Sequence, residues 1–290
     1  MSSIKNTNMR QEKNQIESGV LYLVATPIGN LADLSERAIK VLSEVDFIAA
    51  EDTRNSAHML SYLGIKKELV SYFEHNKRER GEIIAERLLA GESCALITDA
   101  GTPAISDPGE DMVALCAQKG IKVTSIPGAC AAICALTLSA LPTGRFVFEG
   151  FLSTAKNERR KRLDALASED RTMIIYEAPH KLKGTLDDLL SYFGDRRITL
   201  CRELTKLNEE AHRTTISGAI AHYAEVAPRG EYVLVIEGKT ETESEAFWQD
   251  MSIPEHVEYY ISQGETKKDA IKKAAHDRGV PKNEVYKEVI

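Results

Sequence analysis

Short apolar runs alternate with longer amphipathic segments from Gly19 onward. The pattern predicts strands at 20–25, 46–50, 69–72, 94–98 and 122–126, and helices at 34–43, 56–63, 78–90 and 111–119. Apolar runs separated by helical stretches of this kind are typical of βαβ units. We therefore expect an α/β lobe with a mainly parallel sheet.

The segment Leu141-Pro-Thr-Gly-Arg145 interrupts this alternation and predicts a boundary between two lobes, 19–141 and 142–239. Beyond it the pattern predicts strands at 146–150, 172–176, 198–201 and 232–237, and helices at 156–167 and 181–192. Thr240–Glu245 is an acidic, polar linker, and 246–290 is predicted to be a small helical segment with breaks at Pro254 and Gly279–Pro281. The predicted fold class is α/β, with two lobes of mainly parallel sheet and a C-terminal helical segment.

The composition fits a globular protein with two domains. The chain has 290 residues, of which 43% are hydrophobic and 28% are charged, so each lobe can bury a core. Residues 1–18 are polar without an apolar centre, which excludes a secretory signal and predicts a disordered tail. No apolar run approaches the roughly 20 residues of a membrane helix. We expect a cytoplasmic protein without a membrane partner.

Charge and cysteine content narrow the classes of ligand. The formal net charge of −7 gives no global attraction for nucleic acid, so an RNA site has to be a local basic patch. The five cysteines are Cys94, Cys116, Cys130, Cys134 and Cys201. The close pair at 130 and 134 has no histidine nearby in sequence, whereas a metal site needs more ligands at compact spacing. We expect buried thiols in a reducing compartment and no metal.

Three glycine–proline turns follow predicted strands. They are Thr26–Leu31, Asp99–Gly109 and Pro127–Ala129. Ligands of open α/β sheets bind beyond the carboxyl ends of the strands, where glycine lets the backbone approach closely. Each turn alone is explained equally well as a structural turn or as part of a ligand site, but three such turns at one edge of a sheet favour a ligand site. None contains GxGxxG or GxxxxGK[ST], which argues against nicotinamide and ATP chemistry.

Several longer segments carry a resemblance to a known family. In order they are LYLVATPIGNL, AEDTRNSAHML, the pair His75-Asn76, ITDAGTPAISDPG, IPGACAAICAL, IYEAPHKL, CRELTK and GEYVLVIEG. Together they resemble the small-subunit ribosomal RNA 2′-O-methyltransferases of the tetrapyrrole methylase superfamily, from about Gly19 to Gly238. The resemblance implies two α/β lobes of the tetrapyrrole methylase type, S-adenosylmethionine between them, and a homodimer. It also implies methylation of a cytidine ribose in the decoding region of small-subunit rRNA.

The resemblance also implies which residues contact the cofactor. They are Pro27, Ile28, Gly29, Asp99, Gly101, Thr102, Pro103, Ile105, Ser106, Gly128, Ala129, Tyr176, Glu177, Ala178, Gly230 and Glu231. This sequence departs from the family's usual pattern at Ala178 and Cys130, where serine is frequent, and at Lys181, where arginine is expected. These exchanges are small and change the expectation little.

Methyl transfer to a ribose hydroxyl requires alignment of the reacting atoms and an acceptor for the hydroxyl proton. Asp52 and Glu177 are candidates to take or orient that proton, and Arg54 and Asn76 are candidates to hold a phosphate or ribose. Asp52 is as well explained as the cap of the helix that follows it. No single base is assigned from the sequence.

The RNA side of the site requires cations near the cleft. The candidates are Lys156, Arg159, Arg160, Lys161 and Arg162 at the start of a predicted helix, and Arg202 and Lys206 in CRELTK. A basic run of this kind is also typical of a solvated helical face, and Arg202 can pair locally with Glu203. The lysine-rich segment 264–290 can touch RNA or protein, or serve packing.

Two other functions share these features. The first is a precorrin or other tetrapyrrole methylase, which keeps the fold and the cofactor but needs no basic run. The second is a non-catalytic RNA-binding assembly factor that holds the cofactor without turnover. Fold alone does not decide among them. The basic residues favour RNA methylation.

Overall fold

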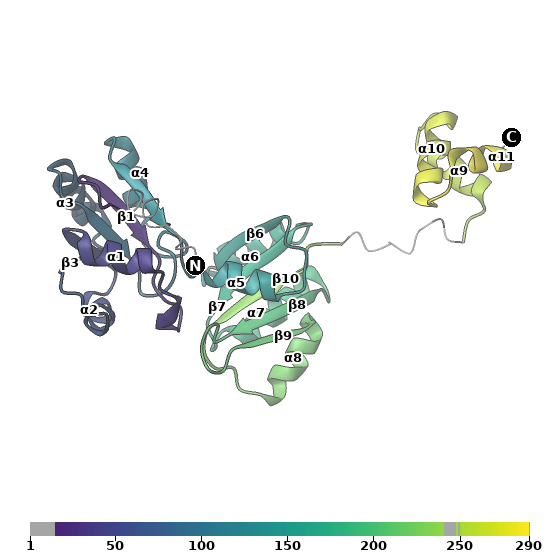
Figure 1. Ribbon diagram of the computed structural model, residues 1–290. Helices are drawn as coiled ribbons and strands as arrows, with labels where there is room; N and C mark the ends of the chain where they lie inside the picture. Colours follow the sequence, from purple (N-terminus) through teal and green to yellow (C-terminus); the bar gives the residue numbers. More distant parts are fainter. Residues whose placement is uncertain (1–14, 241–247, 249, 290) are drawn as a thin grey trace, which may run out of the picture. The chain divides into compact units, whose positions relative to one another are not determined.

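The computed structural model describes residues 15–240, 248 and 250–289. The chain divides into two compact units, Met1–Gly238 and Lys239–Ile290. The first unit contains two five-stranded sheets, and the second is helical (Figure 1). The α/β fold class predicted from the sequence is confirmed.

The first sheet is parallel throughout, as the alternating pattern predicts. Its strands are β1 (Val20–Val24), β2 (Phe47–Ala50), β3 (Glu68–Ser71), β4 (Cys94–Ile97) and β5 (Lys122–Ile126), in the order β3-β2-β4-β1-β5. The helices between them are the short η2 (Leu31–Asp33), α1 (Glu36–Glu44), α2 (Thr53–Tyr62), α3 (Lys77–Leu89) and α4 (Glu110–Gln118).

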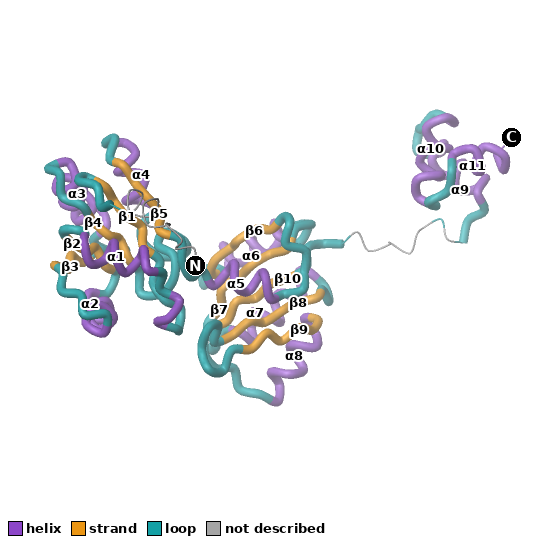
Figure 2. The backbone as a smooth tube through the Cα atoms, in the orientation of Figure 1, coloured by secondary structure: helices purple, strands orange, loops and turns teal. Residues whose placement is uncertain are grey.

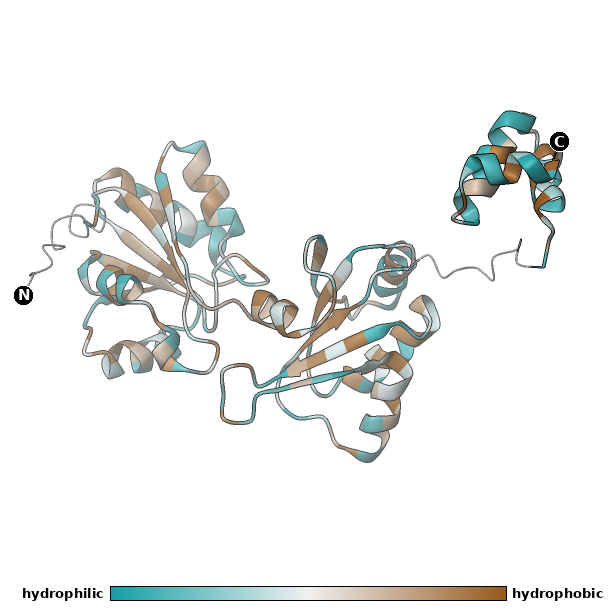
Figure 3. Ribbon diagram, turned by 45° about the vertical axis from the view of Figure 1, so that its right-hand side comes forward, coloured by the Kyte–Doolittle hydropathy of each residue, from teal (hydrophilic) through white to brown (hydrophobic). Residues whose placement is uncertain are grey.

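Both faces of this sheet are covered by helices. Side chains of a strand alternate between faces, so Tyr22 of β1 packs with α1 and α2 while its neighbour Leu21 packs with α3 and α4. Strands covered on both sides are almost wholly apolar, and β2 and β4 are buried along their whole length. Figure 3 shows these inner strands mostly in brown, the hydrophobic end of its scale. This is why the central strands were predictable.

The second sheet is mixed. Its strands are β6 (Phe146–Phe151), β7 (Thr172–Glu177), β8 (Arg197–Arg202), β9 (Glu210–Thr215) and β10 (Tyr232–Ile236), in the order β6-β7-β10-β8-β9 (Figure 2). Only β6 and β7 pair in parallel; β10 runs antiparallel to β7 and β8, and β9 runs antiparallel to β8. The expectation of a mainly parallel sheet therefore does not hold for this lobe. The reason is that a short loop, with no crossover helix, joins β8 to β9.

The helices of the second lobe are α5 (Ala131–Leu138), α6 (Lys156–Leu166), α7 (Leu182–Phe193) and α8 (Ile216–Glu225). One face of the sheet packs against α6, α7 and α8 in a single apolar core. The other face packs against α5, through Ala132, Ala135 and Leu136. Residues 131–138, which the predicted boundary at 141 assigns to the first lobe, thus form a helix that packs on the sheet of the second lobe.

Residues at the predicted ends of the chain fall partly outside the described residues. Residues 1–14 of the predicted tail, and 241–247, 249 and 290 of the linker and C-terminal segment, are among these. Of the tail, Glu17 is described: its carboxylate pairs with Lys122 at 2.6 Å, and its backbone N–H donates to the Tyr22 hydroxyl at 2.8 Å.

The second unit contains α9 (Ile253–Ser262), α10 (Lys267–Asp277) and α11 (Lys282–Val289) around a small apolar core. Ser252 and Glu255 form a capping box at the start of α9. Pro254, which the sequence analysis took as a break, lies in the first turn of α9 instead, where a missing N–H costs nothing. Arg278 joins the end of α10 to the start of α9, since its guanidinium donates to the Ser252 carbonyl at 3.2 Å and to His256 Nδ1 at 3.1 Å.

Among the described residues, every helix is too short or too polar to cross a membrane.

Candidate functional site

Direct hydrogen bonds join the first two turns. Thr26 and Gly101 exchange backbone hydrogen bonds, with N–O distances of 2.9 and 3.1 Å, and the Thr26 hydroxyl donates to the Thr98 carbonyl at 3.0 Å. The first turn follows β1 and the second follows β4, and these strands are neighbours in the sheet. The two turns therefore act as one rigid support at the carboxyl edge of the sheet.

The third turn is fixed to the second. The Thr102 hydroxyl donates to the Ala129 carbonyl at 2.9 Å. A Cβ added at Gly128 would lie 2.7 Å from the Cβ of Ala25, so only glycine fits there. In the second turn, Ala104 and Ser106 have φ values of 66° and 62°. A left-handed conformation at non-glycine residues is uncommon and clusters at functional sites.

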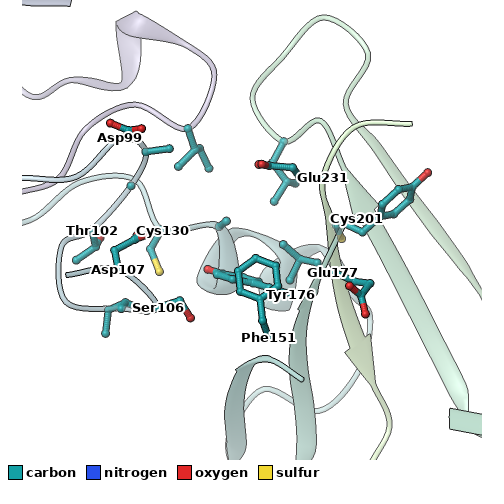
Figure 4. A pocket seen from close by; sticks show the side chains of 18 of the residues that line it. Asp99, Thr102, Ser106, Asp107, Cys130, Phe151, Tyr176, Glu177, Cys201 and Glu231 are labelled. Carbon is teal, nitrogen blue, oxygen red and sulfur yellow. The ribbon is translucent and has the colours of Figure 1, made fainter. Parts of the chain in front are cut away.

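A cavity lies against the first and second turns and the start of the segment after the third, and it is closed by residues of the second lobe (Figure 4). Its lining residues are Ile28, Glu51, Asp99, Ala100, Gly101, Thr102, Ile105, Ser106, Asp107, Cys130, Ala131, Phe151, Tyr176, Glu177, Cys201, Glu203, Leu204, Lys206, Glu231, Tyr232 and Val233. Both sheets thus contribute to one concave site, and the contributions come from the ends of their strands.

The expected cofactor contacts divide into two sets. Nine line the cavity: Ile28, Asp99, Gly101, Thr102, Ile105, Ser106, Tyr176, Glu177 and Glu231. Seven do not: Pro27, Gly29, Pro103, Gly128, Ala129, Ala178 and Gly230. Several of the second set support lining residues instead. For example, a Cβ at Gly29 would lie 2.5 Å from Cγ of Lys206, so this glycine lets the lysine side chain pass.

Most of the charged side chains in the lining are carboxylates. They belong to Glu51, Asp99, Asp107, Glu177, Glu203 and Glu231. The basic side chain among the described lining residues is Lys206, whose ammonium pairs with Glu203 at 3.0 Å. The cavity is therefore suited to a ligand with positive charge.

Crowding of these acids changes their ionisation. Burial, together with the charges of Glu51, Asp99 and Glu231, raises the pKa of Asp107 from its ordinary value to about 6. Burial also raises the pKa of Glu51; a hydrogen bond from the Asp99 backbone opposes this rise, and the negative charges of Asp99 and Asp52 add to it. Such shifts cost stability in the free protein and are relieved when a cation enters.

The second lobe holds its part of the lining rigidly. Glu177 is buried, and its carboxylate accepts hydrogen bonds from the Thr185 hydroxyl at 2.5 Å and the Ala178 N–H at 2.9 Å. The Tyr176 hydroxyl accepts the Ala132 N–H at 3.1 Å, and burial raises the pKa of Tyr176 to about 12. Tyr176 is thus neutral and held in one position in the cavity wall. The carboxylate of Glu177 already accepts hydrogen bonds from α7 and from the backbone that follows β7.

The structure gives Asp52, Arg54 and Asn76 local roles outside the cavity lining. Asp52 caps α2, since its carboxylate accepts the N–H of Arg54 at 2.8 Å, and the guanidinium of Arg54 lies 3.6 Å from the same carboxylate. The Asn76 side chain accepts the Phe73 N–H at 2.8 Å and donates to the Ser71 carbonyl at 3.2 Å. Of the four catalytic candidates, Glu177 alone is among the described lining residues.

Several RNA candidates are already paired with acids. Arg159 bonds Asp188 at 2.7 Å, and Arg162 bonds Glu149 at 2.6 Å. Arg202 pairs with Glu210 at 2.5 Å, not with its neighbour Glu203, which the sequence had suggested.

The remaining candidates of the basic run lie along the exposed side of α6. Arg160 lies 3.9 Å from Asp164, and Lys156 and Lys161 are exposed without an ion pair among the described residues. Lys206 lines the cavity and does not belong to α6.

Sequence reasoning missed two lining residues that matter for the chemistry. Asp107 stands in the recognised segment ITDAGTPAISDPG, but its sequence gave no sign that three other carboxylates surround it. Phe151 directly follows the strand predicted at 146–150, and an aromatic residue at the exposed end of a strand beside a basic helix was an available signal.

Comparison with known proteins agrees with this geometry. The sequence profile described as Tetrapyrrole (Corrin/Porphyrin) Methylases matches residues 20–220. The chain belongs to this family of methylases.

Relatives within the family are more specific. The chain is 48% identical over 273 residues to the Ribosomal RNA small subunit methyltransferase I of Halalkalibacterium halodurans, covering 93% of this chain and 94% of that protein. It is 49% identical to the protein of the same name from Bacillus subtilis, with the same coverage. The resemblance stated from the sequence motifs is confirmed.

Solved structures show the same fold at low identity. Diphthine synthase superposes with a TM-score of 0.58 at 16% identity, covering 76% of this chain and 90% of that structure. Uroporphyrin-III C-methyltransferase from Thermus thermophilus, solved with S-adenosylhomocysteine, gives 0.53 at 18% identity, covering 74% and 96%. At these identities the likeness shows the fold alone.

Proposed function

We propose that the chain is an S-adenosylmethionine-dependent methyltransferase acting on the 2′-hydroxyl of a cytidine in the decoding region of small-subunit rRNA. The observation that carries the proposal is the acidic cavity on which loops and strand ends of both lobes converge. The name shared by the relatives at 48% and 49% identity supports the rRNA substrate.

The cavity fits this cofactor. Its sulfonium and ammonium are positive, and the lining carries carboxylates from both lobes. Ile28, Leu204 and Val233 offer an apolar wall suited to the adenosine, and Gly101 allows close backbone approach. When bound, S-adenosylmethionine supplies a methyl group already activated on sulfur.

The protein then has to position the two substrates, neutralise the positive charge of the cofactor and accept the proton of the ribose hydroxyl. We assign the attraction of the positive cofactor to Asp99, Asp107 and Glu231, and the closure over the adenosine to Tyr176 and Val233. Among the carboxylates, the pKa of Asp107 at about 6 is close to the value that suits a general base. The hydroxyl proton goes to this carboxylate or to water.

The earlier candidates keep supporting roles in this proposal. Glu177 fixes the end of β7 against α7. Asp52 and Asn76 hold the loops after β2 and β3, and Arg54, whose side chain is 88% exposed, is available to an RNA phosphate. We further propose a homodimer in the cytoplasm, with the exposed cations of α6 facing the rRNA. No group of three histidine, cysteine or acidic side chains in the described chain is placed to share a metal ion.

The test is incubation with labelled S-adenosylmethionine and either small ribosomal subunits or a tetrapyrrole, followed by mapping of ribose 2′-O-methylation. We expect label in the rRNA at one cytidine. Label in the tetrapyrrole alone refutes the rRNA substrate. Tight binding of subunits and cofactor without transfer indicates the assembly-factor alternative.

A further inference from the structure

Phe151 is an exposed aromatic residue at the edge of the cavity. It is the last residue of β6, lines the cavity from the second lobe, and is 60% exposed. Single exposed apolar side chains are normal at protein surfaces. This one is unusual because an irregularity of the strand places it there.

The irregularity is a β-bulge in β6. Phe148 pairs with Ile174 of β7, but the next pairs are Gly150 with Ile175 and Phe151 with Tyr176. Residue 149 is therefore an extra residue in the strand. A bulge of this kind re-aims the side chains that follow it and is enriched beside active sites.

The bulge decides which face of the sheet Phe151 occupies. Ile175 belongs to the core under α6, α7 and α8, whereas Tyr176 faces the cavity. If every residue after Phe148 paired in regular register, residue 151 would lie opposite Glu177, whose carboxylate reaches Thr185 of α7. A one-residue shift moves a side chain to the other face. The bulge thus turns Phe151 from the helix-covered face to the cavity.

The ring of Phe151 is held in place by its neighbours. Its centroid lies 5.5 Å from that of Tyr176 with an interplanar angle of 67°, and Tyr176 is braced in turn by Phe148 at 5.1 Å and 74°. Figure 4 shows the rings of Phe151 and Tyr176 next to each other, between the lining residues of the first lobe and those of the second. Edge-to-face contact of this kind fixes a ring while leaving a face of it open.

Cations follow this ring directly in the chain. Helix α6 begins at Lys156, and its exposed Lys156, Arg160 and Lys161 offer charge to a phosphate. No side chain among the described residues caps its first turn. The bulge residue Glu149, whose side chain is 6% exposed, pairs with Arg162 and so ties the bulge to this helix.

We propose that Phe151 is the platform on which a base of single-stranded RNA stacks as the target ribose enters the cavity. An aromatic face beside cations is how proteins hold unpaired nucleotides. The cofactor's adenine is not the partner, because Ile28, Leu204 and Val233 form the apolar wall inside the cavity while Phe151 lies at its exposed edge. This inference rests on the proposed rRNA methylation.

The test compares Phe151→Ala, Phe151→Leu and Phe151→Trp with the wild type and with Tyr62→Ala. Leucine keeps apolar bulk without a π face, and Tyr62, 76% exposed at the end of α2, is a matched aromatic control outside the described cavity lining. Calorimetry measures the S-adenosylmethionine Kd, filter binding measures the Kd for small subunits, and initial rates give kcat/KM with subunits varied.

Loss of one stacked base corresponds to about 5- to 150-fold. We expect kcat/KM and subunit affinity to fall at least about tenfold in Phe151→Ala and Phe151→Leu, and to stay within about threefold of wild type in Phe151→Trp and Tyr62→Ala. The S-adenosylmethionine Kd should stay within about twofold in every variant.

The outcomes separate the two proposals. A wild-type protein that transfers no methyl group to rRNA overturns the proposed function and this inference with it. An active wild type with Phe151→Leu equal to it overturns the inference alone. A loss found in the S-adenosylmethionine Kd assigns the ring to the cofactor and also overturns it. If Phe151→Ala does not fold, the comparison of the leucine and tryptophan variants decides.

Discussion

Replacing Asp107 by asparagine should make the free protein more stable and the cofactor complex weaker. Asp107 is half-buried in the loop after β4, and its neighbours Glu51, Asp99 and Glu231 are also acidic. Burial and these charges raise the pKa of Asp107 from 3.8 to about 6. The ionised side chain is therefore less favourable in the folded state than in the unfolded chain.

The magnitude follows from that shift. A difference of about two pKa units corresponds to about 3 kcal/mol at most, and partial solvent access reduces it, so we expect about 1–2 kcal/mol. The folded protein binds the proton more tightly than the unfolded chain does. The penalty is therefore absent below pH 3.8, grows as the pH rises from 3.8 to about 6, and is fully present above that range.

Denaturant unfolding at pH 8 and pH 5 measures this directly. At pH 8, Asp107→Asn should have the higher free energy of unfolding, and the gap to wild type should narrow at pH 5. Asp187→Asn, an exposed carboxylate on α7 outside the described lining, is the matched control and should change stability by less than about 0.5 kcal/mol. A variant less stable than wild type at pH 8, or a gap that does not depend on pH, would refute the reasoning.

The same variant tests the cavity electrostatics by calorimetry. Wild-type affinity for S-adenosylmethionine should fall as the pH drops through about 6, because Asp107 becomes neutral. The affinity of Asp107→Asn should be lower at pH 8 and vary less over this range. Equal affinities at pH 8 would show that this carboxylate does not face the positive charge.

Three further changes test other parts of the structure. Gly128→Ala should weaken S-adenosylmethionine binding at least about tenfold by calorimetry, because its Cβ would displace the first turn. Gly184→Ala in α7, where no described atom lies within 4 Å of the added Cβ, should instead raise the free energy of unfolding by about 0.5–1 kcal/mol. If both variants had the same effect on binding and on stability, the proposed role of Gly128 would be wrong. Replacing both Lys156 and Lys161 by alanine should reduce the slope of a plot of log K for subunit binding against the logarithm of the salt concentration by roughly one to two. An unchanged slope would show that α6 does not contact the RNA. Arg278→Ala should lower the stability of the second unit by about 2–4 kcal/mol, because the guanidinium of Arg278 donates hydrogen bonds to backbone carbonyls and to His256. Hydrogen exchange measures this stability. Unchanged protection of the amide hydrogens in the second unit would contradict the stabilising role of Arg278.

The sequence predicted what depends on local pattern. Buried strands such as β2 and β4 are continuous apolar runs, so their positions were clear. The strand β9, with the sequence EAHRTT, was missed because it lies at the sheet edge, where polar residues are tolerated. Helix α8, which follows it directly, was missed as well, and with it the antiparallel course of the second sheet.

The parts of the site that depend on backbone conformation were predictable, because short sequence motifs specify that conformation. Glycines and prolines mark the three turns, and nine of the expected cofactor contacts line the cavity. The environment of Asp107 depends on Glu231 from the other lobe, and the direction of Phe151 depends on an extra residue in strand pairing. Both are long-range properties of the fold, which no local pattern encodes.

Acidic and basic side chains lie in different places on this protein, which explains how a chain with net charge −7 can act on RNA, a polyanion, as proposed above. The carboxylates gather inside the cavity, where a cationic cofactor needs them, while Arg159 and Arg162 are neutralised by local acids and leave Lys156 and Lys161 exposed on α6. An RNA backbone meeting the cavity directly would be repelled. Entry of a base and ribose alone, with the phosphates held outside on α6, avoids that repulsion. If the proposed rRNA methylation is right, this charge pattern favours an extruded, single-stranded nucleotide as the substrate.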